Sequence, residues 1–295
     1  MNRDDPFSPF RHPHSATCNR FWHVRELREQ TEILAYLQTD RLYAAYAIGD
    51  LEPWFFRQCR WWLAEADGRW ALILLFGGLQ PPALVCLGEP EGVAAALDCA
   101  PLPDTVYLTA RPEHWPQVEA RYRLRFVHPM FRMALDGGSF RPTETGAAFR
   151  LHMGDLERLQ ALYACGGGEA ADAFAPYQLE QGVFYGLAVD GQLVSAAGTH
   201  LVAPHYGLAA IGNVFTHPAH RRRGYATACT GAVTAALLAQ GLDVVLNVAQ
   251  ANEPAVRLYE KLGYRVHCRF LEGIGEVKAT SQRVNKGQMP LSIQA

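Results

Sequence analysis

The chain has 295 residues, enough for two domains of ordinary size, and its mix of apolar and charged residues is that of a globular protein. A formal net charge of −2 argues against bulk attraction to nucleic acid or to an anionic membrane. The seven scattered cysteines form no C-x-x-C pair, so no metal site is expected, and free thiols fit a reducing cytosol. Because the N-terminus lacks the apolar core of a secretory signal, we expect a cytoplasmic protein with a disordered tail over residues 1–20.

The first half alternates helix-like and strand-like segments. Helices are expected at Val24–Leu37, Arg41–Gly49, Glu91–Leu97 and Pro116–Leu124. Strands are expected at Trp61–Glu65, Trp70–Phe76, Ala83–Leu87, Thr105–Thr109 and Met130–Leu135. Asp67-Gly68 marks a hairpin turn.

The second half follows a turn-rich linker at residues 136–139. Strands are expected at Phe149–His152, Val183–Val189, Gln192–His200, Tyr206–Thr216, Val244–Val248 and Arg265–Leu271. Helices are expected at Leu156–Tyr163, Gly224–Gln240 and Glu253–Leu262. This order predicts an α/β (α+β) protein with two domains, 21–140 and 141–273, and a C-terminal tail over 274–295. Each domain should be a mixed, mostly antiparallel sheet flanked by helices.

A weak internal repeat links the two halves at an offset of 138 residues. Apolar positions of one strand–helix–strand unit match, and Pro116 meets Pro254 at the start of a helix. Two amphipathic units can share such a pattern by chance. The proline match favours duplication.

The strongest local pattern runs from Val214 to Ala226. It is an apolar strand, a turn with a proline, a basic cluster, and then Gly224 at the start of a helix of small residues. The first amides of a helix have no intrahelical partner, and glycine lets a ligand approach the backbone closely. The pattern therefore predicts an anion cradle for a pyrophosphate. A solvated helix cap or a nucleic-acid patch is the alternative interpretation.

Arg221-x-x-Gly224-x-Ala226 resembles the phosphate loop of the GNAT acetyltransferase superfamily. The segment Asn252–Tyr264 resembles the strand–helix motif that follows in that family, and the resemblance covers about residues 149–271. It implies acetyl-CoA, or another acyl-CoA, as co-substrate. Neither a Walker A loop nor a G-x-G-x-x-G fingerprint is present.

The resemblance also implies roles for individual residues. The end of the long strand, Val214, Phe215 and Thr216, is expected to pair with the pantetheine arm, and Asn252 to touch that arm. Tyr259 is expected near the sulfur as general acid, with packing as the alternative. The pyrophosphate is expected at Arg221, Arg222, Arg223, Gly224, Tyr225, Ala226 and Thr227.

The general base is not evident, because the long strand carries no carboxylate. His200, at the end of the preceding strand, is the best candidate, on the strength of its near-neutral intrinsic pKa. Asn213 is expected to orient a water molecule. Cys229 lies among small helix residues and is expected in the core.

The first half lacks the corresponding residues. At the same offset His114 stands for Asn252 and Arg121 for Tyr259, and Glu89 would repel a phosphate. We therefore expect this half to have lost coenzyme A binding. Its tryptophans (Trp54, Trp61, Trp62 and Trp70) are expected mostly in the core, with one wall of an acceptor cleft as the alternative.

These features predict an N-acyltransferase that acts on the amine of a small molecule or amino acid. The alternatives are a protein N-acetyltransferase and a non-catalytic coenzyme A-binding protein. No nucleic-acid or membrane partner is expected, and the oligomeric state is left open.

Overall fold

The computed structural model describes residues 21–135, 138–143, 148–166 and 174–278. Its N-terminal half contains β1 (His23–Leu27), α1 (Gln30–Leu37), α2 (Ala45–Gly49), α3 (Pro53–Phe56), β2 (Cys59–Ala66), β3 (Arg69–Phe76), β4 (Ala83–Gly88), α4 (Pro90–Cys99), β5 (Thr105–Ala110), α5 (Trp115–Arg121) and β6 (Tyr122–Leu135). Its C-terminal half contains β7 (Phe149–Arg150), α6 (Leu156–Ala164), α8 (Pro176–Gln181), β8 (Tyr185–Val189), β9 (Gln192–Ala203), β10 (Leu208–Thr216), α9 (Tyr225–Leu238), β11 (Asp243–Ala249), α10 (Glu253–Leu262) and β12 (Arg265–Val277). The tail predicted over residues 1–20 lies outside the described residues.

All strands join one 12-stranded sheet in the order β1-β2-β3-β4-β5-β12-β6-β11-β10-β9-β8-β7. The two halves use the same pairing pattern. Neighbours from β1 to β4 are antiparallel and β4–β5 is parallel, and neighbours from β7 to β10 are antiparallel and β10–β11 is parallel. The predicted fold class, a mixed and mostly antiparallel sheet in each half, is therefore confirmed.

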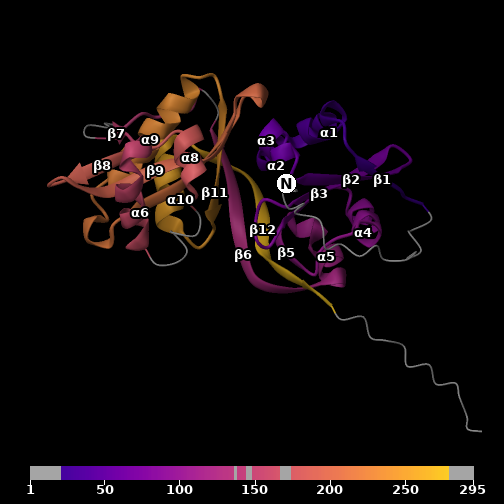
Figure 1. Ribbon diagram of the computed structural model, residues 1–295. Coiled ribbons are helices and arrows are strands. Elements are labelled where there is room, and N and C mark those ends of the chain that lie inside the picture. Colours follow the sequence, from indigo (N-terminus) through magenta and orange to yellow (C-terminus); the bar gives the residue numbers. More distant parts are fainter. Residues whose placement is uncertain (1–20, 136–137, 144–147, 167–173, 279–295) are drawn as a thin grey trace, which may run out of the picture.

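The last strands of the two halves are exchanged. β12 of the second half lies between β5 and β6, and β6 of the first half lies between β12 and β11. Figure 1 shows this pair in the middle of the molecule, between the helices of the two halves. The predicted boundary at residue 140 therefore divides the chain but not the sheet.

Four predicted elements need correction. The helix predicted over Val24–Leu37 is wrong in its first part, because residues 23–27 pair with β2 as β1 and the helix begins only at Gln30. The helix predicted over Arg41–Gly49 begins at Ala45. The helix predicted from Pro116 ends at Arg121, and β6 then runs for 14 residues. β12 continues to Val277, beyond the predicted start of the tail. The last two errors have one cause, because β6 and β12 pair with each other along most of their length.

One hydrophobic cluster crosses from one half to the other. It joins Ile48 and Leu51 at α2 to Leu208 and Ala210 of β10. Burial of such side chains contributes about 1.5–3 kcal/mol each. The cluster therefore holds α2, a helix of the first half, against β9 and β10 of the second.

Two further observations concern the helices and the cysteines. Within the described ranges, no helix is long and apolar enough to cross a membrane. Cys59, Cys86, Cys165, Cys229 and Cys268 are free thiols. Cys99 is disulfide-bonded, so the prediction of free thiols is wrong at this residue. Scattered cysteines without a characteristic spacing do not reveal such a pairing in the sequence.

Candidate functional site

The two parallel strands β10 and β11 separate partway along their length. They pair from Leu208↔Asp243 to Ile211↔Leu246, and beyond that point β10 continues to Thr216 and β11 to Ala249 without pairing with each other. A bulge follows directly in β10, where Asn213 has a φ of 52°. On the side that faces β11, residues 212–216 therefore have no strand partner, so this side of β10 is open to an extended ligand. The carbonyl groups of Asn213 and Thr216 already accept from Tyr163 and Arg221.

The start of α9 forms a cradle next to the end of β10. Gly224 has a φ of 81°, and a side chain built on it would meet no atom within 4 Å. The first helical hydrogen bond runs from the Ala228 amide to the Gly224 carbonyl at 3.0 Å. The amides of Tyr225, Ala226 and Thr227 precede it and lack an intrahelical acceptor. Open space together with free amides fits a phosphate.

The three arginines of the loop have different environments. The Arg221 Nε donates to the Thr216 carbonyl at 3.2 Å, and its guanidinium lies over the Phe215 ring at 5.9 Å. Arg222 and Arg223 are exposed, and neither bonds to a described residue. Arg221 therefore fixes the loop to the strand, while the other two remain available to an anion.

Tyr259 is on the buried side of α10, with 6% of its surface exposed. Burial raises the pKa of its phenol to about 12, and its hydroxyl makes no hydrogen bond with a described residue. The ring packs in the core below α9 and α10, so packing and a role for the hydroxyl are compatible. Asn252 is the N-cap of α10 and accepts a hydrogen bond from the Ala255 amide at 3.3 Å.

His200 lies at the point where β10 and β11 separate. A side chain on Gly212 would come within 2.2 Å of the imidazole, so the ring occupies the space above this glycine. Its Nδ1 is 3.1 Å from the hydroxyl of Tyr46 on α2. Burial lowers the pKa of His200 to about 4. In the folded chain the pKa of His200 therefore lies well below its intrinsic value, because the ring is removed from water.

Asn213 is held by α8 and β9. Its Nδ2 donates to Gln178 Oε1 at 3.1 Å and to the Thr199 carbonyl at 3.4 Å, and its buried Oδ1 has no donor among the described residues. The structure therefore brings Asn213 and His200 to the same end of the opening. Cys229 is buried in the core, as expected, and burial raises the pKa of its thiol to about 12.

Sequence reasoning missed several polar residues on the face of the sheet that α2 covers. Tyr46 comes from α2, Arg132 from β6, Asn247 from β11 and Glu272 from β12. Burial is the main cause that raises the pKa of Tyr46, while the nearby charge of Arg132 lowers it and that of Glu272 raises it. No local motif contains these residues, because the exchange of β6 and β12 is what brings them together.

The matching position in the first half is closed. A side chain on Gly88 would lie 2.4 Å from the Trp70 carbonyl oxygen. The Tyr43 hydroxyl donates to the Cys86 carbonyl at 3.2 Å, and the His114 Nε2 lies 2.7 Å from the Gly88 carbonyl. Protein atoms therefore surround this glycine, whereas the space at Gly224 is open, and the loss of coenzyme A binding in the first half stays a prediction.

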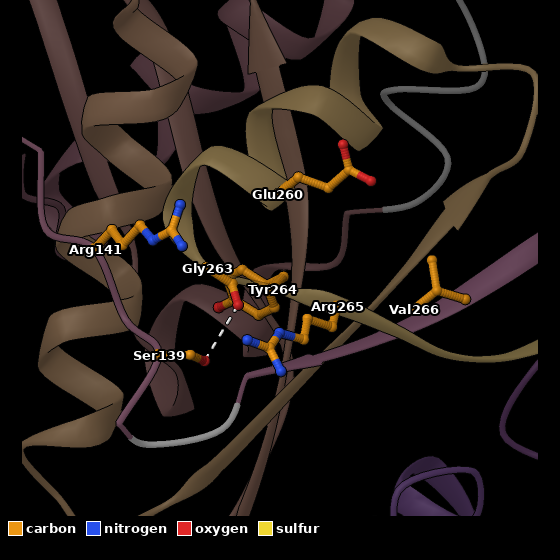
Figure 2. Close-up of a pocket in the computed structure, with 7 residues that line it drawn as sticks. All are labelled: Ser139, Arg141, Glu260, Gly263, Tyr264, Arg265 and Val266. Carbon is orange, nitrogen blue, oxygen red and sulfur yellow. Dashed lines mark hydrogen bonds between the residues drawn. The ribbon is translucent and has the colours of Figure 1, made fainter.

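A cavity of about 430 Å³ lies elsewhere, at the C-terminal end of α10. Figure 2 shows Arg141, Glu260 and Arg265 around it, and the Ser139 hydroxyl donates to the Gly263 carbonyl at 3.2 Å. It contains none of the predicted site residues. We therefore place the candidate site at the opening between β10 and β11.

The tryptophans of the first half divide between core and surface. Trp61 and Trp62 are buried, Trp70 is half-buried and Trp54 is 71% exposed on α3. The core interpretation therefore holds for Trp61 and Trp62. Trp54 does not pack in the core.

The low pKa of His200 predicts a pH effect on stability. Between its unfolded pKa of about 6.5 and its folded pKa of about 4, the unfolded chain binds a proton that the folded chain does not. Stability should therefore fall as the pH drops through this window. His200→Gln should lose less stability than the wild type between pH 7 and pH 4.5 in urea unfolding. Equal losses in the two proteins would show that His200 titrates normally.

Comparison with known proteins agrees with this topology. Residues 185–271 match the family described as FR47-like protein. No curated protein matches the chain. A putative acetyltransferase of the GNAT family from Novosphingobium aromaticivorans is 24% identical, with a TM-score of 0.51 over 67% of this chain and 88% of its own.

Other solved structures span nearly the whole chain. A Drosophila protein is 13% identical, with a TM-score of 0.63 over 86% of this chain and 98% of its own. A GCN5-related N-acetyltransferase-like protein from Streptococcus suis is 18% identical, with a TM-score of 0.53 over 84% of this chain and 98% of its own. The chain therefore has the GNAT acetyltransferase fold, with an FR47-like region in its second half.

Proposed function

We propose that the chain is an acyl-CoA-dependent N-acyltransferase, with acetyl-CoA as the expected donor and the amine of a small molecule or amino acid as the acceptor. One observation carries this proposal: the unpaired edge of β10 leads directly to the open cradle at Gly224. The extended pantetheine arm of coenzyme A would need the strand edge, and its pyrophosphate would need the cradle that follows. The GNAT fold supports the proposal.

Particular residues would hold the co-substrate. The backbone of Val214, Phe215 and Thr216 would pair with the pantetheine arm, as a strand added at a sheet edge does. Tyr225, Ala226 and Thr227 would bind the pyrophosphate through their amides, with Arg222 and Arg223 supplying positive charge. The side-chain amide of Asn252, whose oxygen caps α10, retains its NH₂ group for the arm.

The reaction forms a C–N bond and breaks the thioester C–S bond, while the amine loses one proton and the leaving thiolate gains one. Bound acyl-CoA supplies the activated acyl group. Tyr259 keeps its proton at neutral pH, since its pKa is raised to about 12, and its hydroxyl can protonate the departing sulfur. An amide at Val214 would polarise the carbonyl.

The amine proton needs a different account from the one expected. With a pKa of about 4, His200 is neutral at pH 7 and is a weak base. We assign it the role of a hydrogen-bond acceptor that Tyr46 holds in place. The amine proton passes to a water molecule that Asn213 orients, and water returns a proton to Tyr259 after the transfer.

A protein N-acetyltransferase and a non-catalytic coenzyme A-binding protein are the competing functions. The first needs an open groove for a peptide, whereas α2 and α8 cover this face next to β9. The second gives no reason for a tyrosine that is only 6% exposed to keep a hydroxyl group that bonds to no described residue. Both observations favour a small-molecule enzyme, and we propose a cytoplasmic location for it.

Acetyl-CoA should raise the melting temperature of the protein, and Gly224→Glu should abolish that effect. Ligand at about a hundred times its Kd adds roughly 2.7 kcal/mol to stability. The control is Gly241→Glu, because Gly241 also has a positive φ and open space around it but lies at the other end of α9. It should keep the shift. An unchanged shift in Gly224→Glu would remove the cradle from the site.

Tyr259→Phe should lower turnover by about 10²–10⁴-fold with little change in cofactor affinity, because it removes a general acid. Single-turnover measurements would isolate the chemical step. Tyr264→Phe is the matched control. The hydroxyl group of Tyr264 lies 2.8 Å from that of Thr234 and forms a hydrogen bond within the core. This variant should lower stability by about 1 kcal/mol and leave turnover intact. Equal turnover in wild type and Tyr259→Phe would assign Tyr259 to packing alone.

A further inference from the structure

Arg132 is a buried cation, and two of its N–H-bearing nitrogens have no acceptor in the described part of the chain. Its residue is 2% exposed, and its Nε and Nη1 atoms are buried without an acceptor among the described residues. The guanidinium lies over the ring of Tyr46 at 4.6 Å and over that of Phe270 at 5.5 Å. These rings fix the position of the guanidinium, but aromatic rings are weak hydrogen-bond acceptors for its N–H groups. Such a group is rare, because a buried charge needs a partner to offset its lost hydration.

The guanidinium lies beside the opening between β10 and β11. Arg132 of β6 is the register partner of Asn247, which is the first residue of β11 beyond its last pair with β10. Tyr46 connects Arg132 to the β10 side of the opening, because the Tyr46 hydroxyl bonds to His200 above Gly212. Contacts from Arg132 through Tyr46 to His200 thus run across one face of the opening.

No described carboxylate forms an ion pair with Arg132. Glu272 is the acid whose pKa responds to it, but Glu272 bonds to Tyr107 and accepts from Asn247 Nδ2 at 3.4 Å. Burial raises the pKa of Glu272. Glu272 therefore moderates the charge of Arg132 without satisfying its N–H groups.

Two amide oxygens complement this cation. Asn213 Oδ1 on β10 and Asn247 Oδ1 on β11 are both buried, and neither has a donor among the residues that the structure describes. Their orientations are set by the NH₂ groups, which donate to Gln178 and Glu272. The opening thus has unpaired acceptors on both of its strands and an unpaired donor beside one of them.

We propose that this is the acceptor subsite and that the acceptor is an amino acid, or a closely similar amine that carries a carboxylate. Arg132 binds the carboxylate, and the oxygens of Asn213 and Asn247 accept from the amine. This inference deepens the proposed acyl transfer and rests on it. It also explains why the guanidinium is kept unpaired, because the substrate is its partner.

The test compares the common amino acids with their carboxamides, which keep the amine and lose the negative charge. Thiol release from acetyl-CoA gives kcat/KM for each pair. The wild type should prefer the acid over its amide by at least about tenfold, since a buried charged hydrogen bond is at stake. In Arg132→Met this ratio should fall to about one. Most of the change should be in KM, as expected for a residue that binds the acceptor.

Controls separate this inference from the proposed function and from folding. Arg132→Met should remain folded, because an apolar residue of similar size replaces an unpaired buried charge, and it should keep the acetyl-CoA melting shift. Arg111→Met removes an arginine that is paired with Asp40 and stacked on Tyr43, and it should keep the wild-type ratio. If Arg132→Met fails to fold, the ratio of kcat/KM between acid and amide in the wild type alone decides whether the subsite binds a carboxylate.

Three results would overturn the inference. One is a folded Arg132→Met that still prefers acids. Another is a wild type that uses amides as well as acids. The third is a melting shift with acetyl-CoA but no thiol release with any amino acid, which would leave the cofactor assignment standing. No melting shift at all would refute the proposed function, and the acceptor subsite with it.

Discussion

The pairing of β6 with β12 is the contact on which the rest of the structure depends. Each strand belongs to one half of the chain and lies within the sheet of the other. Their register runs from Arg265↔Ala134 to Val277↔Tyr122, so most of both strands takes part. Because hydrogen bonds of the ladder join the halves, neither half completes its sheet alone. The fold is thus a duplicated unit whose copies are joined by exchange of their last strands.

The candidate site is a consequence of that exchange. β6 carries Arg132 to the edge of β11, and β12 carries Glu272 to the same face. The apolar cluster at Ile48 and Ala210 then holds α2 over the opening, so that Tyr46 reaches both Arg132 and His200. The second half offers the cradle and the unpaired strand edge, while the first half supplies one wall. The two copies have accordingly diverged at one point, where Gly224 faces open space and Gly88 is packed against β3.

Local sequence predicted the parts of this structure that depend on nearby residues. The strand, loop and helix from Val214 to Ala226 form as expected, because their geometry is set by Gly224 and by the small residues of α9. Pairing over long distances escaped prediction. Residues 23–27 form a strand because they pair with β2. Residues 122–129 extend β6 because they pair with β12. The low pKa of His200 and the burial of Arg132 likewise depend on α2 and on strands that are far away in the chain. No residue spacing in the sequence indicates these contacts.

We propose that the two similar halves build a single site and that the second half alone holds coenzyme A. Calorimetric titration of the intact chain with coenzyme A gives the number of sites. We expect one binding site per chain, because Tyr43, His114 and the packed Gly88 fill the matching place in the first half. Two sites of comparable affinity would contradict it.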